Sequence, residues 1–71
     1  MGKRPPITNK VRALREERGM SQSDLGDAIG VTRQTVFAIE QGRYSPSLES
    51  AFRIARLFGV GLEDVFGWEG D

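Results

Sequence analysis

The 71-residue sequence contains no cysteine and no histidine. These absences exclude a disulfide scaffold, a thiol nucleophile, a Cys/His zinc site and acid–base catalysis by histidine. No run of apolar residues is long enough to span a bilayer, and no apolar stretch follows the basic N-terminus as it would in a secretory signal. The sequence predicts one small cytoplasmic domain without a metal, a cofactor or a membrane partner, stabilised by packing alone.

Charge is balanced in total but is unevenly placed along the chain. Ten Lys and Arg residues oppose ten Asp and Glu residues, so the formal net charge is zero. Residues 1–45 carry eight basic and five acidic side chains, whereas residues 46–71 carry two basic and five acidic ones. This asymmetry favours a polyanionic partner for the N-terminal part, although a difference this small is also typical of solvated surfaces.

Capping residues and glycines predict five helices and no strands. The expected helices run from a cap at Thr8 or Asn9 to Gly19, from Ser21 to Gly30, from Thr32 to Gln41, from Ser47 to Gly59, and from Leu62 to Phe66. Most of them begin at a side chain that can accept from free backbone N–H groups, and most end at a glycine. Residues 1–8 are expected to form a flexible basic arm, residues 9–67 the folded domain and residues 68–71 a polar tail.

Residues 22–40 predict two short helices that cross steeply. Gly26 places a small residue where the helices approach, and Gly30 can adopt the positive φ of the turn. The apolar residues that can fill the space between the two helices are Leu25, Ile29, Val31, Val36 and Ile39. This spacing predicts a helix-turn-helix, and a structural αα-hairpin is the alternative.

The outward face of the third helix carries residue types that suit DNA. The residues that point away from the expected core, at about 100° per residue, are Arg33, Gln34, Phe37, Ala38 and Gln41. Arg can bind guanine and Gln can bind adenine through two hydrogen bonds, whereas ordinary solvated surface is the alternative for both. Phe37 is unusual on a polar face. It could contact thymine methyl groups, be covered within the chain by the loop at Tyr44 or by the N-terminal arm, or be covered by a partner protein.

Residues 20–60, MSQSDLGDAIGVTRQTVFAIEQGRYSPSLESAFRIARLFGV, resemble the helix-turn-helix transcriptional regulators of the Cro and phage-repressor (Xre-like) family. The similarity extends over about residues 11–66. It implies an all-α, compact five-helix, lambda-repressor-like DNA-binding domain whose second and third helices form the helix-turn-helix. It also implies that the third helix enters the major groove while the second lies across the phosphate backbone.

The resemblance implies roles for individual residues as well. The base-reading positions of the family match Arg33, Gln34, Phe37 and Ala38, although many relatives carry a polar residue where this chain has Phe37. Phosphate contacts are expected from Gln22, Gln41, Arg43, Tyr44 and Ser45. Arg15 and Glu40 match a pair that joins the first and third helices in relatives, and two unrelated surface charges are the alternative.

The C-terminal part holds more large apolar residues than a five-helix domain can cover alone. The expected core stripe of the fourth helix is Leu48, Ala51, Phe52, Ala55 and Phe58. The two-fold interface, placed as in related regulators, is expected to consist of Ile54, Leu57, Leu62, Phe66 and Trp68. In the alternative, Ile54 and Phe66 complete the core and Trp68 belongs to the tail.

The sequence therefore predicts a sequence-specific regulator that binds a palindromic operator in double-stranded DNA as a homodimer. No catalytic activity is expected. The carboxylates that could pair for acid–base catalysis are Asp24, Asp27, Glu63 and Asp64. They fall at helix starts and on outer faces, where the helix dipole and solubility explain them. A protein-interaction module, such as an antitoxin-like protein that binds a partner, is the alternative function.

Overall fold

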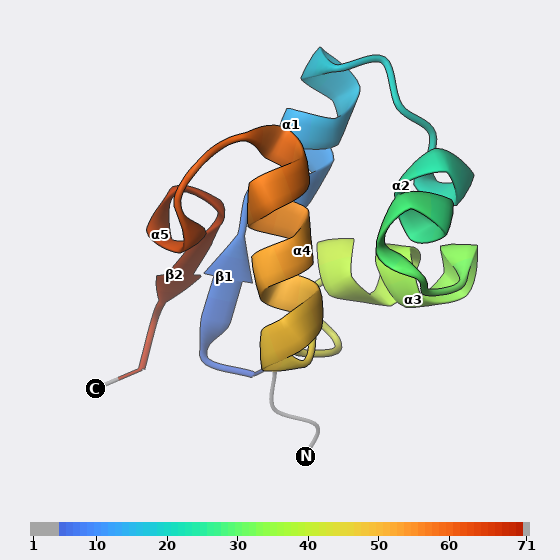
Figure 1. Cartoon of the computed structure of the whole chain (residues 1–71). Helices are drawn as coiled ribbons and strands as arrows, with labels where there is room; N and C mark the ends of the chain where they lie inside the picture. The colour runs from blue at the N-terminus through green and yellow to red at the C-terminus, as the bar shows by residue number, and fades with distance from the viewer. Residues whose placement is uncertain (1–4, 71) are drawn as a thin grey trace.

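The computed structural model describes residues 5–70, which form five short helices and one two-stranded sheet. In chain order the elements are β1 (Ile7–Asn9), α1 (Val11–Glu17), α2 (Gln22–Ile29), α3 (Arg33–Glu40), α4 (Leu48–Phe58), α5 (Leu62–Val65) and β2 (Phe66–Trp68). In Figure 1, α4 stands between the α2–α3 pair on one side and α5 with the two strands on the other. Within the described residues, no helix has the length and apolar character needed to cross a membrane.

Three helices begin at the side-chain caps that the sequence predicts. Ser21 Oγ accepts from the Asp24 backbone N–H at 2.9 Å, and Ser21 N–H donates to Asp24 Oδ2 at 2.9 Å. Hydrogen bonding from Ser21, mainly from its backbone N–H, lowers the pKa of the Asp24 carboxyl below its ordinary value. Thr32 caps α3 and Ser47 caps α4, each by accepting from the backbone N–H three residues later at 3.1 Å.

The first and last helices are shorter than predicted. α1 begins at Val11, and its N-cap residue Lys10 makes no side-chain cap. Asn9, expected as a cap, lies in β1, and its Oδ1 accepts from Val11 N–H at 3.0 Å. At the other end, Phe66 has extended backbone angles and begins β2, so α5 ends one residue before it.

The structure contains a two-stranded sheet, so the prediction of helices without strands is wrong. β1 and β2 pair antiparallel, with Ile7 opposite Trp68 and Thr8 opposite Gly67. Ile7 and Thr8 are therefore not part of a flexible arm, and Trp68 is not part of a tail. Residues 1–4 and 71, which were assigned to these segments, lie outside the described residues. Strands of three residues are too short to produce a detectable alternation of apolar and polar side chains.

The hydrophobic core is formed by all five helices. Its largest fully buried side chains are Val11, Leu25, Val36, Ile39, Ile54 and Val65. The residues predicted to lie between α2 and α3 belong to this cluster, with Val31 half-buried against it. The predicted core of the helix-turn-helix is thus confirmed.

The predicted core stripe of α4 is partly wrong. Leu48 is 69% exposed and Phe52 is 49% exposed, whereas Ile54, expected at a dimer interface, is fully buried. At about 100° per residue, Phe52 and Ile54 lie on opposite flanks of the line through Ala51 and Ala55. Both flanks are apolar, so the sequence allows either to face inward. Packing of α4 against α1 and α2 buries the flank with Ile54.

The turn between α2 and α3 has the geometry that its glycines predict. Gly30 adopts the left-handed conformation with a φ of 81°. The backbone N–H groups of Gly30 and Val31 both donate to Gly26 O, at 2.8 and 2.9 Å. Gly26 is buried, and a Cβ atom added to it would lie 2.7 Å from Val31 O. The close approach of the two helices therefore depends on the missing side chain at Gly26.

Candidate nucleic-acid interface

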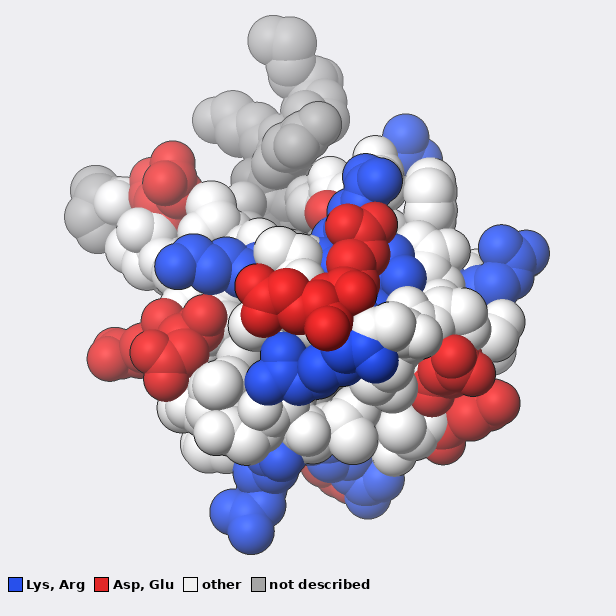
Figure 2. Space-filling model, turned by 90° about the horizontal axis from the view of Figure 1, so that it is seen from above, with Lys and Arg blue, Asp and Glu red and all other residues white. Residues whose placement is uncertain are grey.

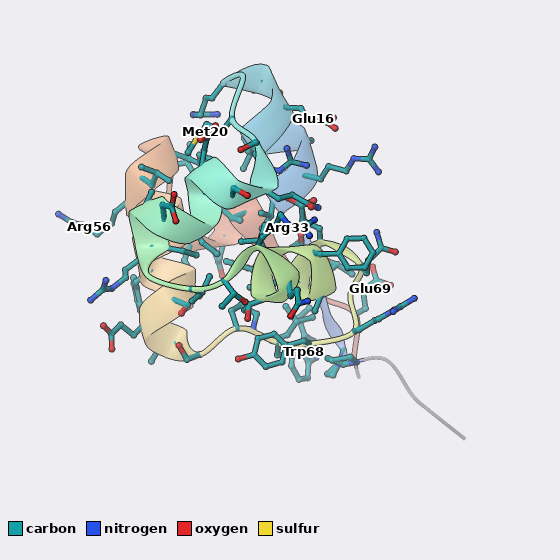
Figure 3. All side chains as sticks on the ribbon, turned by 90° about the vertical axis from the view of Figure 1, so that its right-hand side faces the viewer. Glu16, Met20, Arg33, Arg56, Trp68 and Glu69 are labelled. Carbon is teal, nitrogen blue, oxygen red and sulfur yellow. The ribbon has the colours of Figure 1, made fainter. Side chains whose placement is uncertain are left out.

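α3 exposes the residues that the sequence assigns to base recognition. Arg33, Gln34 and Phe37 are exposed, whereas Ala38 and Gln41 are half-buried. Among the described residues, the side chains of Arg33 and Gln34 have no hydrogen-bond or ion-pair partner. Figure 3 looks onto the helix-turn-helix, with Arg33 near the crossing of α2 and α3. The donors and acceptors at the start of α3 are therefore available to a ligand.

The loop after α3 lies on the same surface. Arg43 and Tyr44 are exposed, and Ser45 is half-buried. The backbone N–H of Arg43 donates to Ala38 O at 3.1 Å, which holds the loop against the end of α3. A shallow hollow between helix and loop is lined by Thr32, Gln34, Thr35, Ala38, Arg43 and Tyr44. The structure thus brings residues assigned to bases and residues assigned to phosphates together.

The positive charge of Arg33 and Arg43 on this surface is not opposed by Glu40. Arg33 and Arg43 are exposed. Glu40, which lies between them in the sequence, has a side chain that is only 2% exposed and is paired with Arg15. By contrast, Figure 2, a view from above, shows acidic and basic side chains side by side over that face. A polyanion is therefore better matched by the surface of α3 and its loop than by the face in Figure 2.

The ion pair expected between Arg15 and Glu40 is present and buried. Arg15 Nε donates to Glu40 Oε2 at 2.6 Å, and Arg15 Nη2 donates to Glu40 Oε1 at 3.1 Å. Arg15 Nη1 also donates to Met20 O at 2.8 Å. The hydrogen bonds to Glu40 raise the pKa of Arg15 above its ordinary value, so the guanidinium stays charged. Two parallel hydrogen bonds of this kind fix the orientation of α3 relative to α1.

Two side chains position α3 in a way that the sequence does not predict. Gln22 Nε2, at the start of α2, donates to Glu40 Oε1 at 3.2 Å. Asn9 Nδ2, in β1, donates to Ile39 O at 2.8 Å. No local sequence pattern predicts either hydrogen bond, because the donor and the acceptor of each are distant in the sequence. The Gln22 amide retains a second N–H and its carbonyl oxygen, so its contact with phosphate stays a prediction.

The residues expected at a dimer interface do not form one surface. Two of the expected residues, Leu62 and Phe66, line one hollow beside α4. Leu48, which was expected in the core, lines the same hollow. Leu57 is nine residues after Leu48, which places it about 180° away around α4. Leu57 therefore faces away from Leu62 and Phe66, although 42% of it is exposed.

A continuous apolar face nevertheless covers this side of the molecule. We define the apolar face as Ile7, Leu48, Leu62, Phe66 and Trp68. Two adjoining hollows share Ile7, Leu62 and Phe66, and among the residues that the structure describes Glu63 is the one charged residue that lines either hollow. Leu48 projects beside one hollow and Trp68, 63% exposed, beside the other. Ile7 and Leu48 were not assigned to an interface, because their position depends on β1 and on the orientation of α4.

The described part of the chain shows no arrangement suited to metal chemistry. No group of three or more His, Cys, Asp or Glu side chains within residues 5–70 could hold a metal ion. Asp24 and Asp64 each accept a hydrogen bond from the backbone N–H at the start of their own helix, at 2.9 and 2.8 Å. These carboxylates therefore serve the helix starts, as the sequence predicts.

The model of a family described as helix-turn-helix matches residues 11–65. The chain belongs to this helix-turn-helix family. An HTH-type transcriptional regulator of Methanocaldococcus jannaschii is 49% identical over 65 residues, which cover 92% of this chain and 98% of that protein. The transcriptional repressor of the cryptic phage CTXphi in Vibrio cholerae is 36% identical over 59 residues, covering 83% of this chain and 53% of the repressor. The fold also matches a crystal structure from Bacteroides fragilis, with a TM-score of 0.77 at 18% identity over 86% of this chain and 98% of that chain.

These similarities establish the general function of the helix-turn-helix protein. It is a transcriptional regulator with a helix-turn-helix DNA-binding fold. Its curated relatives are named as transcriptional regulators, which agrees with the expectation of no catalytic activity. The predicted resemblance and the predicted fold class are confirmed, and the small sheet is an addition to the expected five helices.

Proposed function

We propose that this regulator binds a palindromic operator in double-stranded DNA as a homodimer, with α3 in the major groove. The observation that carries the proposal is the exposed pair Arg33 and Gln34 at the start of α3, whose side chains have no partner within residues 5–70. The N-terminal residues of the recognition helix contact base edges in helix-turn-helix complexes. Arg33 is assigned to a guanine and Gln34 to an adenine, since these pairings allow two hydrogen bonds each.

The phosphate contacts are assigned to residues around α3. The set consists of Gln22, Gln41, Arg43, Tyr44 and Ser45. The exposed cation Arg43 supplies the electrostatic attraction, which is independent of sequence. The amide and hydroxyl groups of the other four supply hydrogen bonds that set the register on the duplex.

Alanine substitutions on α3 should change specificity. An operator is first selected from a random DNA pool, and Kd is measured on it and on variants with single base changes. Arg33→Ala and Gln34→Ala should each weaken operator binding by about 1–3 kcal/mol and relax the preference at one base pair. Arg43→Ala should weaken all sequences alike and reduce the slope of log Kd against log salt by about 1.

Arg56→Ala is the matched control, because Arg56 is an exposed arginine on α4 and lies to one side of the α2–α3 pair in Figure 3. It should bind the operator as the wild type does. Wild-type base preference in both Arg33→Ala and Gln34→Ala would show that α3 does not read the operator.

The homodimer is assigned to the apolar face. Its projecting side chains and its two hollows lie on one surface, so two copies related by a two-fold axis can place the projections of one in the hollows of the other. A palindromic operator requires the two copies of α3 to lie about 34 Å apart, which is one turn of DNA. Half-sites separated by one helical turn are therefore expected.

A glutamate on the apolar face should break the dimer. Leu48→Glu would bury a charge between the two copies, so the dimer Kd should rise at least about tenfold. Leu57→Glu adds the same charge at an exposed leucine on the opposite side of α4, and it should leave the dimer intact. Sedimentation velocity over a range of concentrations measures both.

Two results would reject this interface: a wild-type monomer at every concentration, or equal loss of dimer in Leu48→Glu and Leu57→Glu. A wild-type monomer that selects no DNA sequence would favour the alternative function, a module that binds another protein through the apolar face.

A further inference from the structure

Phe37 is an exposed phenyl ring in the middle of the proposed DNA-binding surface. It is 43% exposed on α3, one turn after Arg33 and three residues after Gln34. A single exposed apolar side chain is common on protein surfaces, but this ring lies on the same outward face of α3 as Arg33 and Gln34. The proposed contacts of Arg33 and Gln34 do not account for this ring.

The loop after α3 does not cover the ring. Tyr44 is itself 48% exposed, and Phe37 is not among the residues that line the hollow between Tyr44 and α3. Phe37 thus stays 43% exposed with Tyr44 and its loop in place. The first four residues of the N-terminal arm, the other cover within the chain that the sequence allows, lie outside the described residues. The exposed part of the ring can therefore contact a ligand that binds to the outward face of α3.

The side chain of Phe37 can make a favourable contact with only one kind of chemical group in the major groove, an apolar one. Phenylalanine has no hydrogen-bond donor or acceptor, so it cannot read the polar base edges that suit Arg33 and Gln34. The apolar group that a pyrimidine presents in the major groove is the C5-methyl of thymine, which apolar side chains including phenylalanine contact. Cytosine presents the same group only when it is methylated at C5.

We propose that Phe37 reads the C5-methyl group of a pyrimidine in the operator. The proposal rests on the proposed function, since it requires α3 to lie in the major groove. Residue 37 is four positions after Arg33, about 6 Å along the helix axis. Because base pairs are spaced by about 3.4 Å along each strand, the methyl group should lie within about two base pairs of the base contacted by Arg33.

Uracil substitution tests this contact directly. Uracil pairs as thymine does and keeps its O4 acceptor but lacks the methyl group. Each thymine of the selected operator is replaced in turn by uracil, and Kd is measured by fluorescence anisotropy for wild type, Phe37→Ala and Phe37→Leu. Losing a methyl contact corresponds to about a fourfold rise in Kd. Wild type should show this rise at one thymine of each half-site, Phe37→Leu should keep part of it, and Phe37→Ala should lose it.

The matched control is Leu57→Ala, which removes a similarly exposed apolar side chain from α4. It should show the same uracil effect as the wild type. If the pyrimidine is a cytosine, 5-methylcytosine in its place should strengthen binding about fourfold for wild type and leave Phe37→Ala unchanged.

Failure of this inference differs from failure of the proposed function. If no operator is selected, the proposed function is wrong. If an operator is bound but Phe37→Ala and wild type respond equally to uracil and 5-methylcytosine at every position, Phe37 reads no methyl group. If Phe37→Ala in addition weakens the dimer in sedimentation, the ring is covered by a second copy, and the proposal is overturned.

Discussion

Arg15→Ala is expected to lower the free energy of unfolding by about 3–5 kcal/mol, because it leaves the carboxylate of Glu40 buried without its partner. The side chains of Arg15 and Glu40 are 10% and 2% exposed, so solvent cannot replace the lost hydrogen bonds easily. Gln22 would remain as a donor to Glu40, but it is neutral. A 71-residue domain has a total stability of about 3–10 kcal/mol, so the variant should be largely unfolded at moderate temperature. Urea denaturation followed by circular dichroism measures the loss.

The matched control is Arg12→Ala, because Arg12 is also an arginine of α1 paired with a glutamate. Its pair with Glu16 is exposed, at 67% and 54%, so its loss should cost less than about 1 kcal/mol. The double variant Arg15→Met/Glu40→Leu removes both charges and should recover much of the lost stability. Equal effects of Arg15→Ala and Arg12→Ala would show that the Arg15–Glu40 pair does not stabilise the fold.

Gly26→Ala is expected to destabilise the regulator by about 1–3 kcal/mol, although alanine favours a helix over glycine by about 1 kcal/mol. The new Cβ atom would lie 2.7 Å from Val31 O and 3.3 Å from Thr32 O. Both neighbours are backbone atoms at the start of the turn into α3, so relief requires the two helices to separate. Operator binding should therefore weaken further than the loss of folded protein explains, since α3 would be displaced. Thermal unfolding and Kd at a temperature where the variant is folded give the two effects.

Ser23→Ala is the control for helix propensity, because Ser23 is exposed on the same helix. It should be neutral or slightly stabilising. A Gly26→Ala variant as stable as the wild type would contradict the close approach between α2 and the start of α3.

The residues of the proposed recognition surface could largely be predicted from the sequence, because they lie on one short helix and the loop that follows. Helical geometry alone places Arg33, Gln34 and Phe37 on the side away from Val36 and Ile39, and the structure has them there. The Arg15–Glu40 pair was identified through the family resemblance, and the structure contains it. The resemblance gives no indication of Gln22 as a donor to Glu40.

Contacts between residues far apart in the sequence were not predicted, even where the helices that carry those residues were predicted correctly. Arg18, at the end of α1, donates to Phe58 O at 2.6 Å, and its guanidinium lies 4.8 Å from the centre of the Phe58 ring. Nothing in the local sequence of either residue marks this contact, which joins the ends of α1 and α4. The apolar face is a similar case, since it combines β1, the start of α4, α5 and β2.

The sequence by itself determined the helices and the turn between α2 and α3. The reason is that a cap such as Ser21 acts within four residues, and a glycine such as Gly30 acts on its own backbone angles. Only the tertiary structure decided the pairing of β1 with β2, the side of α4 that is buried, and the side that Leu57 faces. α4 has apolar residues on both flanks of its buried line, so its own sequence is compatible with more than one orientation. The orientation follows from which flank packs against α1 and α2, and that choice depends on the shape of the whole core rather than on any local pattern.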